Sequence, residues 1–362
     1  ISQIDILRIK RKKYFLIKMR RLAINLLMKR FSMITTIIIL SSGIGFFLLS
    51  DYHSYLQIQN ESAINITITV KFLMLDHLNV YILQPFTERF LELTKLPKRL
   101  PWITANQISY LGVLFALIAA RSILNQNLSL RRLGVLFFLT RQFLDDLDGY
   151  IARYRLGIDA RKQISLPNSS GYLVDGICDA VGIILLVMAS FLRTLQNRKT
   201  IMESTENFDL SPLLNKTKSN YQRILNRMKL SFKHLFFYHK RCSNAKIFLF
   251  HLIQIGISSL LWNYFLIKFH LVMDPKIENG FQNRSLIQRK LFQSPMNLII
   301  MWFWRCLNPH ALTNYLLLSI WLNRTLQYLR FCNKIIVFLL IGLGTISFIH
   351  YIDIQFCTDR FE

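Results

Sequence analysis

The sequence predicts an all-α polytopic membrane protein, and two observations lead to that class. The first is composition, because 52% of the 362 residues are hydrophobic and the mean hydropathy is +0.31. The second is the order along the chain, in which apolar stretches alternate with strongly basic segments. A helix needs about 20 consecutive apolar residues to cross the core of a bilayer, and basic connecting segments are typical of polytopic proteins.

The composition also excludes other classes of protein. The chain has 45 Lys and Arg against 20 Asp and Glu, a net charge of +25. A basic nucleic-acid-binding tail would be poor in large apolar residues, whereas this chain has 28 Phe, so no nucleic acid is expected as a partner. The five Cys contain no CxxC pair, which excludes a disulfide scaffold and a zinc ribbon.

Seven stretches are candidates for transmembrane helices. They are residues 33–49, 105–122, 133–153, 171–192, 247–266, 311–330 and 335–352. The first follows a very basic tail and exceeds the apolar core of about 7–15 residues in a cleaved signal peptide, so we expect an uncleaved signal anchor. The shorter stretch 297–310 is expected to form a re-entrant or interfacial helix.

The orientation follows from the basic residues, since Lys and Arg near the ends of spans resist translocation. With the N-terminus in the cytosol, the cytosolic segments and span ends hold 28 basic and 4 acidic residues, and the remainder is nearly neutral. The predicted organisation is a basic cytosolic tail (1–32), a transmembrane anchor (33–50), a lumenal linker and juxtamembrane segment (51–104), a six-span core (105–352) with a cytosolic basic loop (193–246), and a lumenal tail (353–362).

Two further expectations follow from this orientation. Basic cytosolic segments should contact anionic membrane lipids. Four glycosylation sequons, at Asn60, Asn65, Asn168 and Asn283, fall on the lumenal side.

Carboxylates recur at helical spacing in the third predicted span. Asp145, Asp148, Gly149 and Ala152 lie at i, i+3, i+4 and i+7, so two carboxylates and two small residues share one face, with Arg153 beside them. Charged residues in a bilayer are costly and normally face a bundle interior or a watery cavity. Burial of apolar surface alone therefore does not account for this face.

The fourth span repeats the pattern, because Gly171, Asp175 and Asp179 lie at i, i+4 and i+8. Four carboxylates can thus converge between two adjacent helices. Carboxylates at close range repel one another unless a cation lies among them, and Mg²⁺ and Mn²⁺ prefer carboxylate oxygen. The sequence therefore predicts a divalent-cation site that binds phosphate groups, in preference to a set of helix caps or a cation transporter.

Several neighbouring residues have less definite roles. Asp146 matches no position of the repeated pattern and either supports the site or is structural. Arg141 either contacts phosphate or pairs with a carboxylate. Cys178, His251 and His350 are expected to be packed rather than to bind metal, because none has a His or Cys partner at ligand spacing.

Together the two half-patterns resemble a known family signature. Asp145-x-x-Asp148-Gly149-x-x-Ala152-Arg153 followed by Gly171-x-x-x-Asp175-x-x-x-Asp179 is similar to the motif of the CDP-alcohol phosphotransferase family, and ITANQIS at 103–109 resembles a degenerate start of its first core helix. The seventeen residues 154–170 between the two halves form a longer loop than the family usually has. The resemblance covers roughly residues 100–352 and implies a six-helix core.

The residues within the motif, the longer loop and the extra anchor are most similar to the insect-type ceramide phosphoethanolamine synthase branch. The resemblance implies that phosphoethanolamine passes from CDP-ethanolamine to the primary hydroxyl of ceramide, giving ceramide phosphoethanolamine and CMP. It also implies a homodimer and a lumenal active site in the Golgi membrane, with the endoplasmic reticulum as the alternative compartment. The alternative function is a choline or ethanolamine phosphotransferase acting on diacylglycerol.

The same resemblance assigns roles to the motif residues. It implies that Asp145, Asp148, Asp175 and Asp179 bind Mn²⁺ or Mg²⁺ and that Asp179 is the general base. It also implies that the CDP moiety is bound by the small and basic positions, which are Gly149, Ala152, Arg153 and Gly171.

Overall fold

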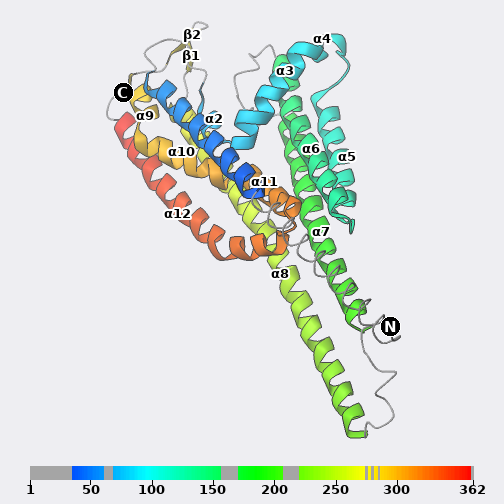
Figure 1. The fold of residues 1–362 in the computed structure, drawn as a ribbon. Helices are drawn as coiled ribbons and strands as arrows, with labels where there is room; N and C mark the ends of the chain where they lie inside the picture. Colours follow the sequence, from blue (N-terminus) through cyan, green and yellow to red (C-terminus); the bar gives the residue numbers. More distant parts are fainter. Residues whose placement is uncertain are drawn as a thin grey trace, which may run out of the picture. The chain divides into compact units, whose positions relative to one another are not determined.

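A computed structural model describes residues 35–60, 68–155, 170–206, 220–273, 276–278, 281–283 and 286–359 (Figure 1). It confirms the all-α polytopic class, because the described segments are helices and their connections apart from one small hairpin. In that hairpin, β1 (Lys276–Glu278) pairs antiparallel with β2 (Phe281–Asn283). The chain divides into two compact units, Ile1–Asn60 and Glu61–Glu362.

Five helical segments of the described residues are long and apolar enough to cross a membrane. They are Thr35–Gln59, Ala105–Ile123, Leu173–Gln196, Ala245–Met273 and Thr325–Phe356. The first belongs to the N-terminal unit and includes most of the expected anchor, while the basic tail 1–32 lies outside the described residues. The predicted span 133–153 is helical but carries too many charged side chains to count as an apolar span.

The larger unit begins with short helices that the sequence did not predict. They are α2 (Val70–Met74), the π-helix η1 (Asn79–Leu83), α3 (Gln84–Thr94) and α4 (Leu96–Arg99). The longer helices follow, namely α5 (Ala105–Ile123), α6 (Leu128–Arg155), α7 (Ser170–Glu206) and α8 (Asn220–Met273). The last four are α9 (Leu286–Phe292), α10 (Pro295–Leu307), α11 (Pro309–Trp321) and α12 (Thr325–Asp359).

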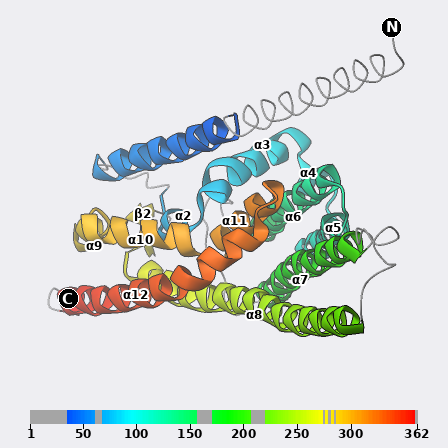
Figure 2. The ribbon, with the colours of Figure 1, turned by 60° about the horizontal axis from the view of Figure 1, so that its bottom comes forward.

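Two groups of helices organise this unit. The helix α5 packs against both α6 and α7, and α12 packs along α8 (Figures 1 and 2). The start of α5 is fixed by a capping box, in which Thr104 accepts from the Gln107 backbone N–H and the Gln107 side chain accepts from the Thr104 N–H. The motif residues lie on α6 and α7, so this three-helix group positions the candidate site.

One predicted span, 311–330, is wrong. The helix α11 ends at Trp321 and α12 begins at Thr325, and Asn323 between them adopts a left-handed φ of 56°. Asparagine tolerates this conformation better than most residues, so it ends one helix and redirects the chain. The stretch 297–310 forms α10, whose 13 residues rise about 20 Å, too short to cross a bilayer.

Two connecting segments also differ from expectation. The predicted basic loop 193–246 is largely helical, since α7 continues to Glu206 and α8 begins at Asn220, with 207–219 outside the described residues. The predicted linker 51–104 contains α2, which is bonded to the core. Both the Trp262 indole N–H and the Asn308 amide donate to the Met74 carbonyl at 3.0 Å. These bonds hold α2 against α8 and the start of α11.

A glycine sets the close approach of α5 to α6. A methyl group at Gly134 would lie 2.9 Å from the Ala119 carbonyl oxygen and 2.9 Å from a carbon of Ile123. Real Cβ atoms do not approach this closely, so the two backbones meet only because residue 134 lacks a side chain.

We therefore predict that Gly134→Ala destabilises the protein by about 1–3 kcal/mol, because α5 and α6 must move apart. Thermal unfolding of the purified protein in detergent measures the effect. Gly256→Ala on α8 is the matched control, since no atom lies within 4 Å of its added methyl group and its helix propensity improves. Equal melting temperatures for the two variants would contradict the proposed close approach.

Candidate active site

The structure brings together three of the four predicted metal-binding carboxylates. One oxygen from each of Asp145, Asp175 and Asp179 lies within 4.8 Å of the others. Asp145 comes from the C-terminal half of α6, and the other two come from the start of α7. The i, i+4 spacing places Asp175 and Asp179 on one face of α7. The helix α5 packs against both α6 and α7, and the Arg141–Asp179 ion pair joins α6 to α7 at the cluster. We call these three residues the acidic cluster.

Arg141 supplies a positive charge to the acidic cluster. Its guanidinium forms an ion pair with Asp179 and is 5% exposed. Room for this side chain comes from Gly182, because a methyl group there would lie 2.8 Å from Arg141 Nε, whereas one at Gly112 would make only an ordinary contact with its Cγ at 3.6 Å. Of the two roles that the sequence left open for Arg141, the structure therefore shows the carboxylate partner.

Asp148 occupies a separate position on the same face of α6. It is 5% exposed, and the Ser109 hydroxyl of α5 donates to its carboxylate at 2.5 Å. It is near enough to interact electrostatically with all three members of the acidic cluster. Ser109 lies in the segment 103–109 that the motif resemblance marked as the start of the first core helix, so this segment contributes a contact to the site.

The small residues of the motif lie close to polar side chains. A methyl group at Gly149 would lie 3.2 Å from Arg153 Nη1, and one at Gly171 would lie 3.8 Å from the Asn106 side-chain oxygen. Ala152, which lies between these two glycines in the sequence, is half-buried. The Arg153 guanidinium lies over the Tyr150 ring at 5.8 Å. The predicted CDP-binding positions lie on the same two helices as the acidic cluster, α6 and the start of α7, and their role stays a prediction.

Lys71 adds a cation that the sequence did not indicate. It lies on the short helix α2 and is close enough to interact electrostatically with Asp145, Asp146 and Asp175. Burial lowers the pKa of Lys71, and the nearby Arg153 guanidinium lowers it further, while these three carboxylates act in the opposite direction. The charge on Lys71 therefore depends on the acidic groups around it.

A second buried carboxylate, Asp76, supports the site from the end of α2. It accepts from the Asn79 amide at 2.5 Å and from the Asn314 amide at 2.9 Å. The Asn314 side-chain oxygen in turn accepts from Gln142 of α6 at 2.8 Å. This chain of hydrogen bonds links α2, α11 and α6, and it holds Lys71 beside the acidic cluster. His310 of α11 also lies near enough to Asp179 to interact with it electrostatically.

The donor atoms of the site fit a divalent cation. Asp175 Oδ1 and Asp146 Oδ2 are buried and have no hydrogen-bond partner among the described residues. Unpaired carboxylate oxygens in a low-dielectric site are costly, and a hard cation is the ligand that satisfies them.

His251 bonds to Gln254 and His350 bonds to Asn297, so both histidines are packed away from the cluster, as expected.

Comparisons with known proteins connect this geometry to one family. Residues 13–358 match the family described as ceramide phosphoethanolamine synthase. The chain is also 32% identical over 263 residues to the ceramide phosphoethanolamine synthase of Drosophila melanogaster. That match covers 73% of this chain and 62% of the relative, less than two thirds of the relative's length. No solved structure matches the chain.

We predict that Mn²⁺ or Mg²⁺ raises the melting temperature of the purified protein in a saturable way, because the cation offsets repulsion within the acidic cluster. Asp175→Asn should weaken this response about tenfold or more. Without metal the variant should be at least as stable as the wild type, since one repelling carboxylate has been removed.

Asp353→Asn is the matched control, because Asp353 is an exposed carboxylate of α12. It should respond to the cation as the wild type does. An Asp175→Asn variant with an unchanged response would contradict the cation site.

Proposed function

Because the chain belongs to the ceramide phosphoethanolamine synthase family, we propose that it transfers phosphoethanolamine from CDP-ethanolamine to the primary hydroxyl of ceramide, giving ceramide phosphoethanolamine and CMP. The observation that carries the proposal is the acidic cluster of α6 and α7, which unites the two halves of the motif. The carboxylate groups and the small residues beside them suit a substrate that carries a diphosphate and reaches the site with a divalent cation.

The donor would bind where acidic, basic and small residues meet. Asp145, Asp148, Asp175 and Asp179 would hold Mn²⁺ or Mg²⁺, and the bound cation would offset the charge of the diphosphate and of the departing CMP. Gly149, Ala152, Arg153 and Gly171 would border the CDP moiety. The position of Lys71 among the same carboxylates supports a role for its ammonium group beside the phosphates.

The transfer step requires one base and one acceptor. The ceramide hydroxyl oxygen forms a bond to the phosphorus that carries ethanolamine, and the bond from this phosphorus to the oxygen shared with CMP breaks. Asp179 would accept the hydroxyl proton. Its ion pair with Arg141 supports this role by fixing the orientation of the carboxylate. The CMP oxygen keeps the electron pair of the broken bond.

We also propose that the active site faces the lumen, because the charge distribution favours a cytosolic N-terminus, and that the membrane is that of the Golgi, as the family resemblance implies. Glycosylation then provides a test of the orientation. In cells, the wild-type chain should migrate faster after glycosidase treatment, and replacement of Asn60 and Asn65 by Gln should reduce that shift. Accessibility of the segment 51–104 to protease from the cytosol would overturn the proposed orientation.

The reaction itself is tested with labelled CDP-ethanolamine and either ceramide or diacylglycerol as acceptor. We expect the label in ceramide phosphoethanolamine, and we expect Asp179→Asn to lower turnover by about 10²- to 10⁴-fold through loss of the base. The control variant is again Asp353→Asn, which should retain wild-type turnover. Transfer to diacylglycerol alone would favour an ethanolamine phosphotransferase, and full turnover by Asp179→Asn would exclude the proposed base.

A further inference from the structure

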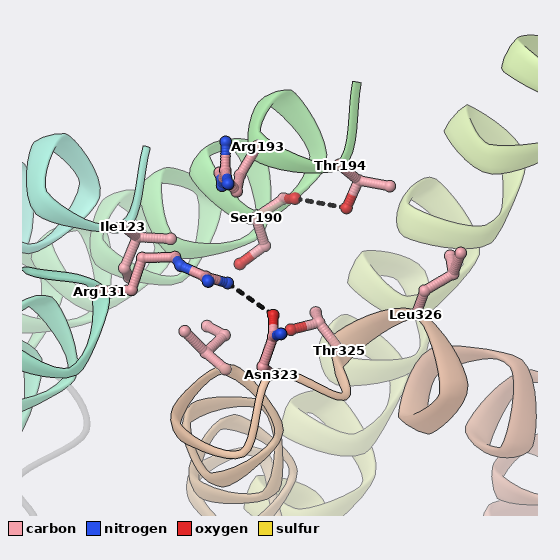
Figure 3. A pocket seen from close by; sticks show the side chains of 9 residues that line it. Ile123, Arg131, Ser190, Arg193, Thr194, Asn323, Thr325 and Leu326 are labelled. Carbon is pink, nitrogen blue, oxygen red and sulfur yellow. Dashed lines mark hydrogen bonds between the residues drawn. The ribbon is translucent and has the colours of Figure 1, made fainter. Parts of the chain in front are cut away.

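A cavity of about 210 Å³ lies far from the acidic cluster, among the end of α5, the beginning of α6, the middle of α7 and the connection from α11 to α12 (Figure 3). About 10–15 Å³ of such space admits one water molecule, so this cavity can hold a polyatomic ion. Arg193 and Asp179 both lie on α7, about 21 Å apart along the helix axis at 1.5 Å per residue. The cavity is therefore separate from the candidate active site.

Two buried arginines line this cavity, one from α6 and one from α7. Arg131 and Arg193 are each 8% exposed. Arg131 donates to the Asn323 side-chain oxygen at 2.7 Å, as Figure 3 shows, but its Nε has no hydrogen-bond partner in the part of the chain that the structure describes. Among the described residues, Arg193 makes one long contact of 3.5 Å to the Gln126 carbonyl, and its Nε and Nη1 are buried without a hydrogen-bond partner there.

No carboxylate compensates these charges within the described part of the chain, because neither arginine forms an ion pair there. The two guanidinium groups also lie close enough to repel each other electrostatically. Buried donors without acceptors and like charges at short range both cost free energy. An anion in the cavity would remove both costs at once.

The start of α12 adds further donors. Thr325 and Leu326 line the cavity and are the first two residues of this 35-residue helix. The first backbone N–H groups of a helix have no carbonyl partner within it, and the positive end of the helix dipole favours negative charge. Arginine forks and helix N-termini are the groups with which proteins most often bind phosphate.

We propose that this cavity binds a phosphate group, held between Arg131 and Arg193 and facing the N-terminus of α12. The group could belong to the headgroup of an anionic phospholipid or to free phosphate, which share the same chemistry. The sequence assigns this end of α6 to the cytosolic side, so either source would reach the cavity from the cytosol or the cytosolic leaflet.

The test uses the purified full-length protein and its thermal unfolding. In detergent, sodium phosphate is titrated against sodium chloride at constant ionic strength. In nanodiscs, phosphatidylcholine alone is compared with phosphatidylcholine containing phosphatidic acid. We expect a saturable rise in melting temperature. Arg193→Gln should weaken the response about tenfold or more, because a charge-assisted contact is lost.

Two variants make the result specific. Arg121→Gln removes an exposed arginine at the end of α5 and should respond as the wild type does. Arg193→Lys keeps the charge, should retain part of the response, and replaces Arg193→Gln if that variant does not fold. Transferase turnover without added anion should be unchanged in all three.

A response to free phosphate in detergent would identify a phosphate site, and a response to phosphatidic acid alone would identify a headgroup site. The proposal is overturned if the wild type responds to neither. It is also overturned if Arg193→Gln responds as the wild type does, or if Arg121→Gln loses as much as Arg193→Gln, since the effect would then be general surface attraction.

Discussion

Charge compensation between α6 and α7 is the constraint on which the rest of the larger unit depends. Three carboxylates converge there, and such groups are costly away from water unless positive charge or a cation lies among them. Arg141 pairs with one of them from within α6, and Lys71 approaches from α2. The hydrogen bonds from Trp262 and Asn308 to α2 therefore do more than pack a short helix, because they hold one of the compensating charges in place.

The close packing of three helices makes this compensation geometrically feasible. Gly134 lets the backbones of α5 and α6 meet, and Gly182 leaves room for the Arg141 side chain. A larger residue at either of these positions would separate the helices or displace the guanidinium. Ser109 then reaches Asp148 across the same interface. Small residues thus determine which polar groups can meet.

Local periodicity explains what could be predicted from the sequence. Spacing predicted one acidic face with Asp145 and Asp148 and a second with Asp175 and Asp179, because helical geometry is fixed by neighbours a few residues apart. The structure brings Asp145 of the first face together with both residues of the second. Lys71 and His310 were missed because they approach the site from segments distant in sequence, which no spacing rule relates to α6 or α7. The break at Asn323 was missed because hydropathy stays high on both sides of a turn set by one backbone conformation.

The composition of α6 has a consequence for the way the protein enters the membrane during synthesis. This helix carries Arg141, Asp145, Asp146 and Asp148 within its length, and each charged residue near the centre of a lone span costs about 2.5–3.5 kcal/mol on insertion. Its main packing partner is α5, and the carboxylate that pairs with Arg141 lies on α7. Part of the free energy that retains α6 in the bilayer, the ion pair of Arg141, therefore becomes available only after α7 has been synthesised, so we expect α5, α6 and α7 to insert together rather than one at a time.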